Sequence, residues 1–376
     1  MTRFIEFLIS LAIVAVIFIV VGFLLPSHRH VEHSVETNRN ISIVYDTISS
    51  FSRFAQWNVL PLRDPNMDIR VSDNASGVGA RLDYTSELEG LGKGSWEIVE
   101  AVPGKSVTYA ITDEERGQDK VTTFTLTPTG RNNRNVKITQ TYDIDYGMNL
   151  LGRYSGLYVS SGTGEAMKMG LQRLTNMLAA VPNYDYNEFE VAPKLVDRPA
   201  TNLLVVTAAV ERNNDVVQRT MNNNMQWIEK VMKSNGLEPA GPLRIITNEF
   251  GAENYSFDVA QPVRKASGAS TETAVEDGED VEADQARAEA AAQAPAGKLE
   301  IKLEGPVEHE FVEAQKEAMV PFSGHMATLP RVRDTLRAWV LTQGYETAGR
   351  PYEEWMKGID DSFTEEGEFQ AYWGLR

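Results

Sequence analysis

The chain has 376 residues, an apolar fraction of 42%, six tryptophans and a formal net charge of −17. This charge argues against a nucleic-acid partner, because binding to a phosphate backbone needs clustered lysine and arginine. The sequence contains no cysteine, which excludes disulfides, thiolate nucleophiles, iron–sulfur clusters and zinc sites with cysteine ligands. After the first 26 residues, the remaining length allows two domains of ordinary size.

Residues 4–25 form an apolar run that is interrupted only by Glu6 and Ser10 and stops before Pro26. At about 1.5 Å per helical residue, a helix over this run is about 33 Å long and can cross the hydrocarbon core of a bilayer, which is about 30 Å thick. A cleaved signal peptide is the alternative, but the sequence offers no convincing small-residue cleavage site after the run. We therefore expect residues 1–26 to be a transmembrane anchor that contacts the membrane through residues 4–25.

The orientation of this anchor is weakly coded. Arg3 precedes the run, whereas Arg29 and Arg39 follow it, so the positive-inside rule gives little net signal. Single N-terminal anchors commonly leave the bulk of the chain outside. We expect a single-pass protein of a bacterial inner membrane, with its soluble part on the periplasmic side.

Residues 31–181 show the order strand, helix, many strands, long helix. Glycines and other turn residues separate six short patterns of alternating apolar residues, and these predict strands at 67–72, 79–87, 94–101, 106–112, 121–127 and 135–144. They are preceded by a predicted strand at 31–36 and a predicted helix at 41–57. The closing helix at 163–180 carries an apolar stripe that ends at Pro182. The pattern predicts an α+β domain in which a curved antiparallel sheet holds one long C-terminal helix.

A single helix covers a concave sheet incompletely, so the space between them is expected to be an apolar pocket. The connection at 147–159 is expected to act as its lid. The alternative is a sheet and a helix packed solid.

Five short segments of this domain occur in the order seen in the START-like polyketide cyclase/dehydrase superfamily, and the similarity covers residues 31–181. They lie at 54–61, 64–67, 77–80, 92–98 and 170–174. The resemblance implies a helix-grip fold with a hydrophobic cavity, for which Trp57, Trp96, Leu171 and Leu174 are the candidate lining residues. This superfamily contains enzymes, lipid carriers and sensors, so the fold alone does not give the function.

Residues 182–200 have little periodicity and are expected to be a linker. Beyond them, the segment that begins at Gly236 recurs at Gly344, and each copy follows an amphipathic helix that carries a tryptophan. The helices are predicted at 215–233 and 329–342, and each follows a predicted strand, at 202–210 and 308–319. Two copies of strand–helix–strand–strand predict a pseudo-twofold domain with a cleft where the copies meet.

The duplicated topology and the segment at 349–355 resemble the gyrase-inhibitor-like domain, an effector-binding module also attached to some AraC-type regulators, over residues 201–375. The resemblance implies an aromatic cleft with a buried carboxylate that holds small hydrophobic, amphipathic or cationic ligands. The candidate ligand-binding residues are Glu353, Glu354, Trp227, Tyr255, Trp339, Trp355 and Tyr372.

Residues 264–297 interrupt this domain with an acidic segment that lacks aromatic residues, so it cannot bury enough surface to offset the entropy of ordering. We expect a disordered insertion. A solvated spacer is its simplest interpretation, and a basic protein partner is the alternative.

We expect no catalytic residues, no metal site and no cofactor. The pair His28 and His30 is more typical of a membrane-proximal stem than of a metal site, and the glycine-rich turns lack the context of a phosphate loop. The leading hypothesis is a membrane-anchored binder of small hydrophobic or amphipathic molecules or lipids, acting in sensing, sequestration or envelope stress. The alternatives are an enzyme with cyclase, hydratase or hydrolase activity and a protein-interaction scaffold.

Overall fold

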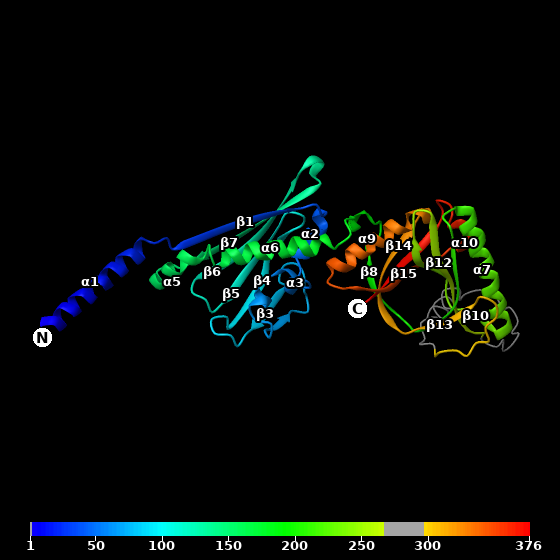
Figure 1. The fold of residues 1–376 in the computed structure, drawn as a ribbon, viewed down its shortest axis with the longest axis horizontal. Helices are drawn as coiled ribbons and strands as arrows, with labels where there is room; N and C mark the ends of the chain where they lie inside the picture. The colour runs from blue at the N-terminus through cyan, green and yellow to red at the C-terminus, as the bar shows by residue number, and fades with distance from the viewer. Residues whose placement is uncertain (1, 267–296) are drawn as a thin grey trace, which may run out of the picture. The chain divides into compact units, whose positions relative to one another are not determined.

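The computed structural model describes residues 2–266 and 297–376, and the chain divides into two compact units. Unit 1 is Met1–Asp185 with Thr342–Gly344, and unit 2 is Tyr186–Leu341 with Tyr345–Arg376. Each unit contains one antiparallel sheet (Figure 1). The predicted α+β class is confirmed. Most of the acidic segment predicted at 264–297, and with it the expected protein partner, lies outside the described residues.

Unit 1 begins with helix α1 (Thr2–Leu24), the apolar run predicted as an anchor. Its stretch Arg3–Leu24 is long and apolar enough to cross a membrane, a test that a signal sequence also passes. The large apolar side chains of this stretch are exposed in the folded chain.

The sheet of unit 1 has seven strands in the order β1-β7-β6-β5-β4-β3-β2. Long helix α6 (Thr163–Ala179) packs on this sheet through Leu171, Leu174 and Leu178, which are almost fully buried. The arrangement is a helix-grip fold, as predicted. The strands are β1 (His28–Thr37), β2 (Asp68–Val71), β3 (Arg81–Thr85), β4 (Lys93–Val102), β5 (Ser106–Asp113), β6 (Gln118–Thr129) and β7 (Asn135–Asp145).

The helix predicted at 41–57 is broken into α2 (Ile41–Ile48) and α3 (Phe54–Trp57), followed by α4 (Leu60–Arg63). The break falls at three serines, and serine side chains compete with the helix for backbone hydrogen bonds. Ser50 forms an isolated bridge with Ser76, and its hydroxyl accepts a hydrogen bond from the Ser52 backbone. The shorter helix α3 places Phe54 and Trp57 in the core beneath α6.

Three short elements complete unit 1. Turn η1 (Arg131–Asn133) joins β6 to β7. Helix α5 (Leu150–Ser155) and turn η2 (Gly156–Tyr158) connect β7 to α6. Helix α5 packs against the C-terminal part of α1.

The sheet of unit 2 has the order β13-β9-β12-β11-β15-β16-β14-β8, with β10 paired to β12. The repeated halves are β9–α7–β11–β12 and β14–α9–β15–β16, and they meet where β11 pairs with β15. The elements are η3 (Tyr186–Glu188), β8 (Lys194–Arg198), β9 (Thr201–Glu211), α7 (Asn214–Asn235), β10 (Leu237–Pro239), β11 (Leu243–Phe250), β12 (Asn254–Lys265), β13 (Glu308–Val312), β14 (Gln315–Ser323), η4 (Met326–Thr328), α9 (Leu329–Thr342), β15 (Thr347–Trp355), α10 (Gly358–Asp361) and β16 (Glu368–Leu375).

The two repeat glycines have the same local role. Gly236 and Gly344 follow α7 and α9 with φ angles of +62° and +89°, a left-handed conformation that favours glycine. The sequence recurrence therefore reflects two equivalent helix ends.

Two differences from the sequence analysis concern strands at the sheet edges. The single strand predicted at 308–319 is two strands, because β13 pairs with β9 whereas β14 pairs with β16 and β8. Strand β8 lies inside the residues predicted as a linker, and Arg264 and Lys265, assigned to the acidic insertion, belong to β12. Each edge strand joins the half of the repeat to which it does not belong in sequence.

Candidate functional site

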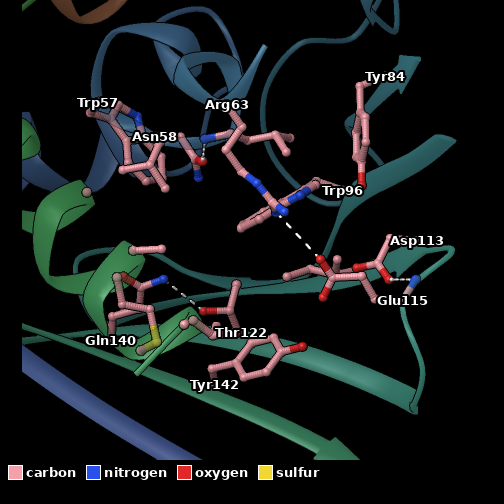
Figure 2. Close-up of a pocket in the computed structure, with 18 residues that line it drawn as sticks. Trp57, Asn58, Arg63, Tyr84, Trp96, Asp113, Glu115, Thr122, Gln140 and Tyr142 are labelled. Carbon is pink, nitrogen blue, oxygen red and sulfur yellow. Dashed lines mark hydrogen bonds and ion pairs between the residues drawn. The ribbon is translucent and has the colours of Figure 1, made fainter. Parts of the chain in front are cut away.

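A cavity of about 410 Å³ lies in unit 1 between the sheet and the N-terminal half of α6 (Figure 2). Cavities that hold small molecules typically have volumes of 300–1,000 Å³. The lining residues are Trp57, Asn58, Val59, Leu60, Arg63, Tyr84, Trp96, Ile111, Asp113, Glu115, Thr122, Gln140, Tyr142, Gly162, Thr163, Ala166, Met167 and Gly170. Sheet alternation positions part of this set, because Ile111 and Asp113 are two residues apart on β5 and Gln140 and Tyr142 are two apart on β7.

One part of the cavity wall is aromatic. The rings of Trp57 and Trp96 each pack edge-on against Phe54, with ring centroids 5.2 Å apart in both pairs. Trp57 also contacts Phe124 and is 1% exposed, so this wall is continuous with the core of the unit. It offers a ligand apolar and aromatic surface fixed by packing.

Another part of the wall is polar and charged. Arg63 of α4 points toward Glu115, and their charged atoms lie 3.5 Å apart (Figure 2). Asp113 is ion-paired with the buried ammonium group of Lys120, and the amide of Gln140 donates to the Thr122 hydroxyl over 3.1 Å. A ligand with an apolar body and a polar end matches this division of the cavity.

Tyr84 adds a hydroxyl to the polar wall. A Cβ atom at Gly94, its cross-strand partner, would collide with the Tyr84 ring, so only glycine fits there. Burial, followed by the charges of Asp113 and Glu115, raises the pKa of Tyr84 to about 12. The hydroxyl therefore stays neutral, and able to donate a hydrogen bond, at a higher pH than an ordinary tyrosine does.

We expect titration of Tyr84 to destabilise unit 1 at high pH. The folded pKa lies above the ordinary value of 10, so the stability from the neutral hydroxyl is complete below pH 10 and is lost as the pH rises toward about 12. Absorbance titration of wild type and Tyr84→Phe should differ by one tyrosine transition with a midpoint near 12. If the transition that Tyr84→Phe removes had its midpoint near 10, the raised pKa of Tyr84 would be contradicted.

The four residues predicted for this pocket occupy two kinds of position. Trp57 and Trp96 line the cavity. Leu171 and Leu174 are 1% and 0% exposed on the buried face of α6 and are not among the lining residues. The sequence did not predict the charged lining residues Arg63, Asp113 and Glu115. They are far apart in the chain, and α4 and the end of β5 come together only in the folded unit.

The connection at 147–159, expected to be the lid, does not line the cavity. After Tyr142, the next residue along the chain that lines the cavity is Gly162. Helix α5, which lies in this connection, contacts α1 instead. The expected lid role is therefore wrong for these residues.

In unit 2, Glu354 belongs to a buried charged and aromatic network. Its carboxylate is ion-paired with Arg198 and with Arg244, the latter at 3.1 Å. The guanidinium groups of these arginines lie over the stacked rings of Tyr372 and Tyr352, respectively. The Tyr352 hydroxyl donates to the carboxylate of Glu317, which is 1% exposed.

Glu353 points to the opposite face of the sheet. It is 0% exposed, and Arg333 of α9 donates to its carboxylate over 2.5 Å. Tyr255 and Trp355 are also fully buried on this face in the main apolar core of unit 2. Neighbouring residues of a strand project to opposite faces, so Glu353 and Glu354 do not share a site.

The other two predicted residues lie elsewhere. Trp227 of α7 is 39% exposed beside Lys230, and Trp339 of α9 packs against a separate apolar cluster. Of the seven residues predicted for unit 2, the structure brings Glu354 and Tyr372 into one network. The arginines that neutralise the two glutamates were missed, because strand pairing and α9 packing bring them there from distant parts of the sequence.

The histidines near the N-terminus pair with an aspartate. Asp143 accepts hydrogen bonds from His28 and His30 at 3.1 and 2.8 Å on the exposed stem strands. Over residues 2–266 and 297–376, no group of three or more histidine, aspartate or glutamate side chains is arranged to hold a metal ion.

Residues 28–179 match the model of a family described as polyketide cyclase / dehydrase and lipid transport. The match begins with the first residue of β1 and ends with the last residue of α6, so it covers the helix-grip part of unit 1. This match supports a ligand-binding role. The resemblance of residues 201–375 to the gyrase-inhibitor-like domain stays a prediction.

Three solved structures illustrate the similarities of the chain. A protein from Chromobacterium violaceum is 17% identical, with 41% of this chain and 98% of that chain covered and a TM-score of 0.30. A point mutant of Thalictrum flavum norcoclaurine synthase, in complex with a transition-state analogue, is 14% identical, with coverages of 40% and 94% and a TM-score of 0.32. The C-terminal domain of EcmrR is 16% identical, with coverages of 49% and 96% and a TM-score of 0.34. No curated protein sequence matches the chain.

Proposed function

We propose that this protein is a membrane-anchored binder of a small amphipathic molecule or lipid, which it holds in the cavity of unit 1. The observation that carries the proposal is the division of the cavity wall into the aromatic surface of Trp57 and Trp96 and the polar surface around Arg63, Asp113 and Tyr84. An amphipathic ligand places its apolar body on the first and its head group on the second, so both surfaces are used.

The contacts of α1 support its retention as an anchor. Arg153 donates to the carbonyls of Phe23 and Leu25 over 3.0 and 3.2 Å, and Tyr154 donates to the carbonyl of Phe18 over 2.8 Å. A helix removed after secretion would leave the guanidinium of Arg153 without these partners. We also propose that the soluble part of the chain lies on the outer side of a bacterial inner membrane, the arrangement that single N-terminal anchors commonly adopt.

Binding can be tested with a brominated fatty acid, which quenches tryptophan fluorescence at short range. We expect the probe to quench Trp57 and Trp96 in the full chain. Ala166→Phe should raise the dissociation constant obtained from this quenching at least about tenfold, equivalent to about 1.4 kcal/mol. Ala166 lines the cavity, so the added ring occupies the space of the probe. Native mass spectrometry of the protein purified from its source should also reveal a bound molecule.

The matched control is Ala179→Phe, which lies on the same helix at an exposed position. This variant should bind the probe as the wild type does. Equal quenching in Ala166→Phe and Ala179→Phe, with both proteins folded, would refute the proposed binding site, as would the absence of quenching in the wild type.

An enzyme is the second candidate, because the polar wall carries groups capable of acid–base chemistry. Asp113 and Glu115 are carboxylates in the cavity wall, and Lys120 adds a buried ammonium group beside Asp113. A bound molecule whose mass changes during incubation, and no longer changes in Asp113→Asn, would favour this candidate over a binder.

A further inference from the structure

Helix α5 packs against the last two turns of α1. The rings of Phe18 and Tyr154 stack with centroids 4.3 Å apart, and the Tyr154 hydroxyl donates to the Phe18 carbonyl. Gly22 is buried, and a Cβ atom there would lie 3.2 Å from Leu150. The absence of a side chain at Gly22 therefore allows the two helices to approach closely.

Arg153 closes the C-terminal end of α1. The side chain donates to the carbonyls of Phe23 and Leu25, and its other nitrogens donate to the Gly147 carbonyl over 2.9 and 2.6 Å. The last carbonyls of a helix lack partners within the helix, and in a membrane they also lack water. Arg153, which is 9% exposed, supplies donors from the folded unit and fixes α5 to this end.

The length of α1 decides where this contact lies relative to a bilayer. If the residues from Phe18 onward stood outside the membrane, the 15 residues at 3–17 would span only about 22 Å. That length is shorter than a hydrocarbon core of about 30 Å. The whole of Arg3–Leu24 is therefore needed to cross, and the residues that contact α5 fall in the outermost third of the span.

The exposed surface of α5 and of the residues beside it is mainly apolar, as expected for a segment in the outer third of a bilayer. Four large apolar side chains between β7 and α6 are strongly exposed, namely Met148 (73%), Leu151 (51%), Leu157 (51%) and Tyr158 (72%). Exposed apolar side chains gathered beside an apolar helix are typical of a segment that lies in the membrane interface.

We infer that residues 148–158 insert into the head-group region of the bilayer beside α1, so that the lipid surface covers Met148, Leu151, Leu157 and Tyr158. This inference rests on the proposed role of α1 as an anchor. Figure 1 shows α5 next to the end of α1 and directly before α6. The cavity lining starts at Gly162 and Thr163, a few residues after the inserted segment. The inserted segment and this part of the cavity wall are therefore adjacent in the chain.

The chain has no native cysteine, which allows single spin labels to be placed in the full protein. We would label Leu151→Cys and Leu157→Cys in liposomes of phosphatidylcholine and phosphatidylglycerol. Collision of each label with lipid-soluble oxygen is then compared with collision with a water-soluble nickel chelate. Ile13→Cys reports on the anchor, and Val78→Cys is the control, because Val78 is 60% exposed in a turn of the same unit.

We expect the labels at positions 151 and 157 to collide mainly with oxygen, as at position 13, and the label at position 78 to collide mainly with the chelate. Labels at 151 and 157 that behave like position 78, while position 13 stays in lipid, would overturn the inference and leave the anchor standing. A water-exposed label at position 13 would overturn the anchor as well. Spin–spin broadening between two copies at position 151 would assign the surface to a second chain and also overturn the inference.

Discussion

Replacing Glu353 by glutamine is expected to reduce the free energy of unfolding of unit 2 by about 3–5 kcal/mol, because a buried charge loses its partner. Glu353 is 0% exposed and Arg333 is 7% exposed, so water cannot replace the lost carboxylate. Urea-induced unfolding of the full chain, with hydrogen exchange followed in peptides from α9 and β15, would measure this loss.

Helix α9 offers a matched control. Arg331 lies two residues before Arg333 and is ion-paired with Glu188, and about 60% of each of these side chains is exposed. Glu188→Gln should therefore cost no more than about 1 kcal/mol. A similar small cost for Glu353→Gln would show that the buried pair does not stabilise unit 2. A ligand that binds through the Glu353 carboxylate is not favoured, because that carboxylate already accepts from Arg333.

Replacing Trp57 by alanine is expected to reduce the free energy of unfolding of unit 1 by about 3–5 kcal/mol, the usual cost of removing a large buried ring. Trp57 is 1% exposed and packs against Phe54 and Phe124 as well as lining the cavity. Urea-induced unfolding monitored by circular dichroism measures the change. Quenching by the brominated fatty acid should fall as well, because Trp57 is one of the two tryptophans that the probe is expected to quench.

Trp227→Ala is the control of the same residue type. Trp227 is 39% exposed on α7, so we expect its removal to cost no more than about 1 kcal/mol. If Trp57→Ala were as mild as Trp227→Ala, the aromatic wall would not be part of the rigid core, and a preformed cavity would lose its support.

The elements that the sequence predicted well are those in which periodicity and burial coincide. The stripe through Leu171, Leu174 and Leu178 on α6 is an example, because one face of a helix against one sheet gives an unambiguous pattern. Helix α9 has the predicted bounds, Leu329–Thr342. The helix predicted at 41–57 was too long, since apolar spacing continued across serines that end α2.

The candidate site was harder to predict than the fold. Trp57 and Trp96 could be named from short segments, whereas the charged wall requires the register of β5, the position of α4 and the turn before β6. The partners of Glu353 and Glu354 were missed for the same reason, although the alternation of strand side chains already separates two adjacent glutamates. Contacts between distant segments leave no local pattern in a single sequence.

The exchange of edge strands in unit 2 bears on how this unit arose and folds. Strand β8 pairs with β14, and β13 pairs with β9, so neither half is complete alone. Two identical chains that trade their first strands form this topology as a homodimer, and joining them end to end gives a single polypeptide with the same sheet. Such a fused pair must bring residues near 195 and 318 together to complete one half and residues near 204 and 309 together to complete the other, so both halves depend on pairing between distant segments, which slows folding.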